Sequence, residues 1–365
     1  MQRFVKIRKM EPNNSLPKIQ SETPFKKEIR KAEEAKNEAY HFYLLIKNPE
    51  NEINKILTDE IEIFEKKIKE SPALKKRCEI LFLTKERYYE KIRQRLARYL
   101  SLECVCDPKN LDNLNFKRLK SVIGMGLQEI ISVIENDLPL YDKLFSELDS
   151  IRETDKKVEL YIGRDGIYAY EGRRAIDTAR RRKKTKEEKA QRKLLEIHPK
   201  YINYNSFIKK NFDEETRVRY LQDQGVDSSQ DLIIFDTGYR GSIPEQILRS
   251  IGFSQEEIEK RIKILGTDFY INSNAGYEEN LKEKNKIRKR VVRGIPNSIE
   301  NYNKVSNIEE RPKRHLTSSG LYINEQGKLT ATEAPLLNEV SFHYDLIELT
   351  IRQYYFNREY FQKNI

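Results

Sequence analysis

Two short apolar runs, each followed at once by a loop that contains glycine, constrain the fold of this chain more than any other feature. The first run is Val158–Ile162, and the second is Leu232–Phe235. Continuous apolar runs of this length are typical of strands that are buried on both faces of a parallel sheet. The sequence therefore predicts a parallel α/β domain over about residues 158–271.

Further strand and helix patterns extend this prediction. Tyr201–Tyr204 is a weaker strand candidate and Ile262–Gly266 a stronger one, and helical patterns separate the candidates. Strands that alternate with helices predict an α/β class fold, a parallel Rossmann-like sheet flanked by helices. We expect residues 155–275 to form this α/β domain. Ligands of open parallel sheets bind outside the carboxyl ends of the strands.

The remaining segments have different patterns. Residues 1–24 contain three prolines and little apolar periodicity, which predicts a flexible tail. Residues 25–154 repeat apolar positions at helical spacing, which predicts an all-helical region. Within 276–365 the turn Glu325–Gly327 predicts a hairpin, and 337–361 predicts an amphipathic helix. We expect this last segment to complete the α/β domain.

Positive charge is concentrated in two stretches. The chain has a formal net charge of +11, and Arg173–Lys193 alone holds eleven Lys or Arg against three acidic residues. Leu281–Arg293 holds seven against one. Such fields attract phosphates, nucleic acids or anionic membrane surfaces. The alternative for each stretch is a solvated helix face.

The cysteines and the N-terminus bear on cellular location. Cys78, Cys104 and Cys106 are too few for a disulfide framework, which fits a reducing compartment. The first residues are basic but lack the apolar segment of a secretion signal. No run of about 18 apolar residues is present, so we expect no transmembrane segment. We predict a cytoplasmic protein, and export by a route without such a signal stays open.

The loop after the second apolar run has the features of a phosphate site. Asp236 leaves the strand, Gly238 and Gly241 permit tight backbone turns, and Ser242 can cap the next helix. The N-terminus of a helix binds phosphate through its free N–H groups, and Arg240 can add a bidentate contact. The alternative is an ordinary strand-loop-helix turn. The candidate phosphate-binding residues of the two loops are Arg164, Gly166, Thr237, Gly238, Arg240, Gly241 and Ser242.

Acidic residues at two strand ends are the candidate catalytic groups. Asp165 and Asp236 can together hold a divalent cation such as Mg²⁺, or they can position a nucleophile. The alternative for Asp165 is a salt bridge with Arg164 that holds the loop. Arg173, Asp268 and His315 are further candidates. The structural alternative is an exposed basic helix face for Arg173, a turn that ends a strand for Asp268 and a surface loop for His315. We expect His343 to be a packed helix residue.

The order of the two loops resembles known families. Arg-Asp-Gly after one strand and Asp-x-Gly-x-x-Gly-Ser after a later one look like bacterial phosphoribosyltransferase-like (Rossmannoid) proteins, in which an Arg-Asp-Gly loop pairs with a phosphate loop. The second resemblance is to haloacid-dehalogenase-like proteins. The similarity covers about a third of the chain.

The first resemblance implies a role for each loop. Gly238–Ser242 would cradle a 5-phosphate, Asp236 would lie near the ribose hydroxyls, and Arg164 with Asp165 would lie near the pyrophosphate. The chain departs from both families. Phe235 stands where phosphoribosyltransferases usually carry an acidic residue. A phosphatase of the second family needs another aspartate two residues after Asp165, a position that Asp165-Gly166-Ile167 does not supply.

Three classes of function follow from these patterns. The leading hypothesis is a cytosolic enzyme that acts on a phosphorylated sugar or nucleotide by phosphoribosyltransferase-like transfer. A haloacid-dehalogenase-like phosphatase is the enzymatic alternative. The non-catalytic alternatives are a nucleic-acid-binding protein that uses residues 173–193 and a partner-binding protein whose helical N-terminal part is the recognition surface.

Overall fold

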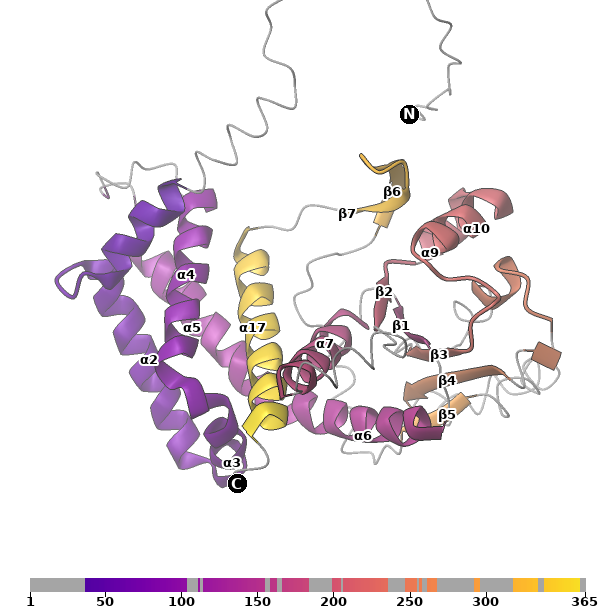
Figure 1. Ribbon diagram of the computed structural model, residues 1–365. Helices are drawn as coiled ribbons and strands as arrows, with labels where there is room; N and C mark the ends of the chain where they lie inside the picture. Colours follow the sequence, from indigo (N-terminus) through magenta and orange to yellow (C-terminus); the bar gives the residue numbers. More distant parts are fainter. Residues whose placement is uncertain are drawn as a thin grey trace, which may run out of the picture.

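The computed structural model shows a helical region joined to a parallel sheet (Figure 1). It describes residues 37–103, 111, 114–154, 158–162, 166–183, 199–204, 206–235, 247–254, 256–257, 261–267, 292–295, 318–333 and 338–361.

The described part of the N-terminal region is helical, as its periodicity predicts. A helix over 37–47 is followed by α2 (Glu52–Glu70), α3 (Pro72–Leu81), a 3₁₀ turn (Phe82–Thr84), α4 (Lys85–Glu103), α5 (Phe116–Ser132), a π turn (Val133–Asp137) and α6 (Leu138–Thr154). The Asn51 side chain caps α2 by accepting from the N–H of Ile53 at 2.9 Å. Ser71 caps α3, and Pro72 occupies its first turn, where a missing N–H costs nothing.

The sheet is parallel, as predicted, and it has one strand more than expected. Its strands are β1 (Val158–Ile162), β2 (Lys200–Ile202), β3 (Leu232–Phe235), β4 (Ile262–Thr267) and β5 (Val292–Ile295), in the order β2-β1-β3-β4-β5. The sequence did not predict β5, because Arg293 and Gly294 interrupt its short apolar pattern at the end of a basic stretch. The interpretation of Leu281–Arg293 as a charged stretch alone was therefore incomplete.

Helices cover both faces of the sheet. Leu160, Leu232 and Ile234 pack in one apolar cluster with α9 (Ser206–Asn211) and α10 (Glu214–Asp223). The intervening residues Tyr161, Ile233 and Phe235 belong to the other cluster, which also contains α7 (Gly166–Lys183) and the N-terminal helices. Alternate residues of a strand point to opposite faces. Burial of both sets explains why these runs are apolar, with Glu159 of β1 as the exception.

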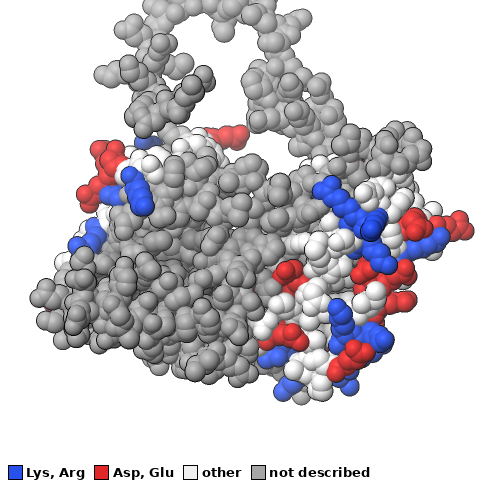
Figure 2. All heavy atoms as spheres, turned by 180° about the vertical axis from the view of Figure 1, so that it is seen from behind, with Lys and Arg blue, Asp and Glu red and all other residues white. Residues whose placement is uncertain are grey.

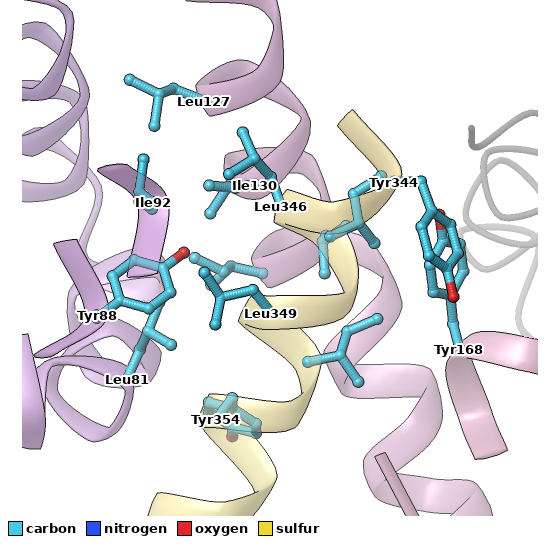
Figure 3. Packing of buried hydrophobic residues seen from close by; sticks show 14 of the residues in the cluster. Leu81, Tyr88, Ile92, Leu127, Ile130, Tyr168, Tyr344, Leu346, Leu349 and Tyr354 are labelled. Carbon is cyan, nitrogen blue, oxygen red and sulfur yellow. The ribbon is translucent and has the colours of Figure 1, made fainter. Parts of the chain in front are cut away.

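The C-terminal helix α17 (Asn338–Phe361) lies between the N-terminal helices and α7 (Figure 1). Figure 3 shows Tyr88 of α4 facing Leu349 of α17, and Tyr168 of α7 stacked on Tyr344. The predicted helix is confirmed, and it belongs to the helical region as much as to the sheet. His343 donates from Nε2 to the carbonyl of Val122 at 3.0 Å, which confirms that it is a packed helix residue.

The predicted hairpin is present beside the sheet. β6 (Ser318–Ile323) and β7 (Leu329–Glu333) pair antiparallel, and Gly327 in the turn has a φ of 73°. Asp223 of α10 accepts from the N–H of Leu329 at 2.8 Å, which fixes the hairpin against α10. Among the described helices, none is long and apolar enough to cross a membrane.

Candidate functional site

The carboxyl ends of β1 and β3 lie side by side. Their parallel pairing sets Tyr161 opposite Phe235. The Arg-Asp-Gly motif begins two residues after Ile162, the last residue of β1, and Asp236 follows directly after Phe235. The segments that contain the two motifs therefore begin at the ends of adjacent strands, at the same edge of the sheet.

The strand on the far side of β3 ends at the same edge. β4 pairs with β3 so that Phe235 stands opposite Leu265, and its last residue is Thr267. Asp268 is the next residue in the sequence. Three of the predicted site segments therefore begin at three neighbouring strand ends.

Most of the predicted site residues themselves lie outside the described residues. They are Arg164, Asp165, Asp236, Thr237, Gly238, Arg240, Gly241, Ser242, Asp268 and His315. Gly166 and Arg173 are the two whose surroundings the structure describes. His315 belongs to the segment between β5 and β6, and no described contact relates it to the strand ends.

Gly166 is the buried first residue of α7. A Cβ atom at this position would lie 3.3 Å from the carbonyl carbon of Tyr161 and 3.4 Å from its Cβ. The contact with the carbonyl carbon is tighter than most Cβ atoms make, so glycine allows α7 to begin directly against β1. The close approach positions the N-terminus of α7 at the end of the strand that precedes the Arg-Asp-Gly motif.

Arg173 has a structural environment. Its guanidinium is fully buried and donates to both carboxylate oxygens of Glu159, from Nε at 3.0 Å and from Nη2 at 2.8 Å. Nη1 donates to Asp149 of α6 at 2.7 Å. Burial alone would lower the pKa of Arg173, but the charge of Glu159 holds this pKa above its usual value. The alternative that placed Arg173 on an exposed basic face is wrong, and its described partners are carboxylates of the protein itself.

The ion pairs continue from Asp149 toward the C-terminus. Arg180 donates from Nη2 to Asp149 at 2.8 Å and from Nε to Glu359 of α17 at 3.0 Å. Burial alone would raise the pKa of Asp149, but hydrogen bonds from Arg180 hold this pKa below its usual value. A ladder of alternating charges thus joins β1, α7, α6 and α17.

Tyr161 and Phe235 pack side by side on the face of the sheet that contacts α7, near the carboxyl ends of β1 and β3. Their ring centroids are 5.8 Å apart, and both residues are buried. Burial, followed by the charge of Glu159, raises the pKa of Tyr161 well above its usual value. Its hydroxyl donates to Glu159 at 3.3 Å. Tyr161 therefore stays neutral, and it shields the Glu159–Arg173 pair.

Asn203 is a candidate that sequence reasoning missed. It follows directly after β2, whose Ile202 pairs with Ile162, so it lies at the same edge of the sheet as the motif loops. The side chain is 8% exposed, and its amide nitrogen has no hydrogen-bond partner within the described part of the chain. A buried amide donor without a partner costs free energy unless a ligand or water satisfies it. The sequence placed Asn203 inside the strand candidate Tyr201–Tyr204, and a polar residue within that candidate was the available signal.

Metal binding at this edge depends on residues outside the described ranges. Within the described ranges, no group of three or more His, Cys, Asp or Glu side chains is arranged to hold an ion. Asp165 and Asp236, the predicted Mg²⁺ ligands, do not belong to those ranges. Their strands are adjacent, which is the arrangement that two carboxylates need to share one cation.

Neither a protein-family model, nor a curated protein, nor a solved structure is significantly similar to this chain. A fold class alone does not identify a function. The arrangement of the strand ends and the chemistry of the residues that follow them therefore carry the functional proposal.

Proposed function

We propose that this protein is an enzyme that acts on a phosphorylated sugar or nucleotide by phosphoribosyltransferase-like transfer. We propose in addition that the parallel sheet belongs to the doubly wound, Rossmann-like class. The strand order β2-β1-β3-β4-β5 is one of the two common orders of such sheets. Coverage of both sheet faces by helices agrees with this assignment.

The position of the two motifs is the observation that carries the proposal. The chain leaves β1 toward β2 on one side and leaves β3 toward β4 on the other, so the order of the strands reverses between β1 and β3. Ligands of doubly wound sheets bind in the crevice at this switch point, outside the carboxyl ends of the strands. Gly163–Asp165 follows one of these two strands, and Asp236–Ser242 follows the other.

The residues of the two loops suit a phosphorylated ligand. Gly238–Ser242 would bind a phosphate through backbone N–H groups, with Arg240 as a bidentate donor. Asp236 would accept from the ribose hydroxyls, and Arg164 would contact the pyrophosphate. Asn203 would donate its amide hydrogens to the ligand from the neighbouring strand end. Catalysis would rest on positioning and on neutralisation of the leaving pyrophosphate.

A magnesium ion fits this proposal. Asp165 and Asp236 follow adjacent strands, so their carboxylates would hold the ion between the two loops. A bound Mg²⁺ would neutralise charge on a pyrophosphate group. The protein's own residues would position the sugar and exclude water.

The phosphatase alternative is less well supported. It needs a second acidic residue two positions after Asp165, and that position is Ile167. Ile167 is 6% exposed and packs in the apolar cluster beside α7. A carboxylate could not take this place without disturbing the core.

Binding of phosphoribosyl pyrophosphate tests the proposal. We expect it to raise the melting temperature of the full chain in the presence of Mg²⁺, because a ligand that binds the folded state stabilises it. Asp236→Asn and Arg240→Gln should each abolish this rise. Asn203→Ala should reduce it, because the amide donor is lost.

The control is Asp59→Asn, which makes the same charge change at an exposed aspartate of α2. It should leave the rise in melting temperature unchanged. A rise that survives both Asp236→Asn and Arg240→Gln would contradict the proposed site. No rise with phosphoribosyl pyrophosphate, sugar phosphates or nucleotides would contradict the proposed class of ligand.

A further inference from the structure

A group of cationic side chains from three helices surrounds Lys91, away from the sheet. Lys91 lies on α4, and Arg87 and Arg95 lie one turn before and one turn after it, on the same face of the helix. Arg352 of α17 and Arg182 of α7 complete the group, which we call the Lys91 cluster.

Contacts with α17 hold the Lys91 cluster together. Lys91 donates from Nζ to Oε1 of Gln353 at 2.8 Å. The amide nitrogen of Gln353 donates to Thr84 at 2.9 Å and to Asn357 at 2.8 Å, which fixes its oxygen toward Lys91. The guanidinium of Arg182 lies 5.2 Å from the ring centroid of Phe356. Phe356 is one turn after Arg352 on α17.

The positive charge of the cluster is only partly compensated. Arg352 pairs with Glu348 at 2.6 Å and with Glu171 at 3.5 Å, and Asp345 lies 3.8 Å from Arg95. Within the part of the chain that the structure describes, Lys91, Arg87 and Arg182 make no ion pair with a carboxylate. The partner of Lys91 is a neutral amide, which leaves its charge in place.

This arrangement is unfavourable without a further anion. Burial, followed by the charges of Arg87, Arg352, Arg95 and Arg182, lowers the pKa of Lys91 to about 8. Like charges held together at a partly buried position repel one another and must be stabilised elsewhere. A neutral donor at position 91, such as the amide of glutamine, could pair with Gln353 without this electrostatic cost. The retained charge therefore indicates a role other than packing.

We propose that the Lys91 cluster binds a soluble anion that carries several linked phosphate groups. The planar guanidinium groups suit bidentate contacts with phosphate oxygens, and a lysine adds a compact charge. Lys91, Arg87 and Arg182 supply three positive charges without a paired carboxylate among the described residues, which suits an anion that carries several negative charges. The site lies on α4, α7 and α17, so the inference does not rest on the function proposed for the strand ends.

Calorimetric titration of the full chain with sodium tripolyphosphate tests this site. We expect saturable binding that weakens as salt is raised. Lys91→Met should lower the affinity by about tenfold to a hundredfold, the range expected for loss of a hydrogen bond to a charged group. Arg87→Gln changes an exposed residue and should also weaken binding, which keeps the test valid if Lys91→Met perturbs folding.

Two control variants distinguish the Lys91 cluster from ordinary surface charge and from the strand-end site. Lys66→Met removes the same charge from an exposed lysine of α2 and should change the affinity by less than about twofold, as expected for screened surface charge. At the strand-end site the pattern should reverse, because Asp236→Asn should abolish the magnesium-dependent rise in melting temperature with phosphoribosyl pyrophosphate and Lys91→Met should leave that rise in place. Absence of binding, or equal losses in Lys91→Met and Lys66→Met, would overturn the inference.

Discussion

Replacement of Arg173 by methionine tests whether this residue is structural. The side chains of Arg173 and Glu159 are 0% and 1% exposed, and three short hydrogen bonds join the guanidinium to Glu159 and Asp149. Removal of Arg173 would leave the Glu159 carboxylate buried without the guanidinium that pairs with both of its oxygens. Loss of one partner of a buried ion pair costs about 3–5 kcal/mol. We expect Arg173→Met to lower the free energy of unfolding by this amount.

A double variant isolates the cause. Glu159→Leu combined with Arg173→Met removes both charges, and apolar replacements of buried ion pairs are often neutral. We expect the double variant to recover most of the stability that Arg173→Met loses. Arg180→Met is the matched control on the same helix. The side chain of Arg180 is 33% exposed, so we expect a loss of about 1 kcal/mol or less.

Urea unfolding followed by circular dichroism measures these differences, because the chain has no tryptophan to report by fluorescence. A loss below about 1 kcal/mol for Arg173→Met would refute the reasoning, since breaking a buried pair costs more than this. So would a double variant that is less stable than Arg173→Met alone. Either result would reopen the interpretation of Arg173 as a ligand-binding residue.

Three further predictions concern single residues. A Cβ at Gly172 would lie 3.0 Å from the rings of Phe145 and Tyr355, whereas a Cβ at Gly124 would meet only the flexible end of the Glu60 side chain. Urea unfolding should therefore show that Gly172→Ala is less stable than Gly124→Ala by about 1–3 kcal/mol. Equal stabilities would show that the two aromatic rings move aside to accommodate the methyl group. The folded state releases the Lys91 proton near pH 8, whereas the unfolded chain keeps it until about pH 10.5, so wild type should lose stability relative to Lys91→Met as the pH falls between these values. A constant difference would show that the pKa of Lys91 is not lowered. Burial raises the pKa of Cys78 to about 12, so its thiol should be unreactive in the folded protein. In a variant that carries Cys104→Ser and Cys106→Ser, iodoacetamide at pH 8 should label Cys78 in urea and leave the native protein unlabelled. Labelling of the native protein would contradict the burial of Cys78.

The strands that carry the motifs were predictable because burial on both faces leaves a continuous apolar signature. β3 spans the four residues of its apolar run, Leu232–Phe235. β5 lacks this signature, because a strand with arginine and glycine at its centre resembles the basic segment before it. Local pattern therefore located the strands that carry an apolar run and missed the one whose run is interrupted.

The burial of Arg173 was not predicted, although a signal for it existed. Within the sequence, Arg173 begins a basic stretch and looks like part of a charged helix face. Glu159, however, stands inside an otherwise apolar strand, and a buried carboxylate requires a cationic partner. The spacing from β1 into α7 makes a basic residue of that helix the nearest candidate. An acidic residue within a buried strand should therefore direct the search for its partner to the following helix.

The place of α17 depends on contacts that no local pattern encodes. Tyr88 and Thr350 are hydrogen-bonded at 2.7 Å although 262 positions separate them in the sequence. Asn357 donates to the carbonyls of Ile80 and Leu81, which links the C-terminal helix to the end of α3. The sequence predicted the helix and its length, but its packing among the N-terminal helices follows from the complete fold.

This packing bears on the idea that the helical N-terminal part is a recognition surface for a partner. Removal of residues 1–110 would delete α2, α3 and α4 and would expose the face of α17 that packs on α4, including Phe342, whose ring lies 5.3 Å from that of Tyr99. Exposed apolar surface of this kind destabilises a domain and promotes aggregation. A truncated chain that fails to bind a partner would therefore report misfolding as readily as a lost surface. Substitutions of exposed residues in the intact chain are therefore the valid test. Figure 2 shows, on the side of the molecule turned away in Figure 1, Lys and Arg side chains interspersed with Asp and Glu side chains among the described residues.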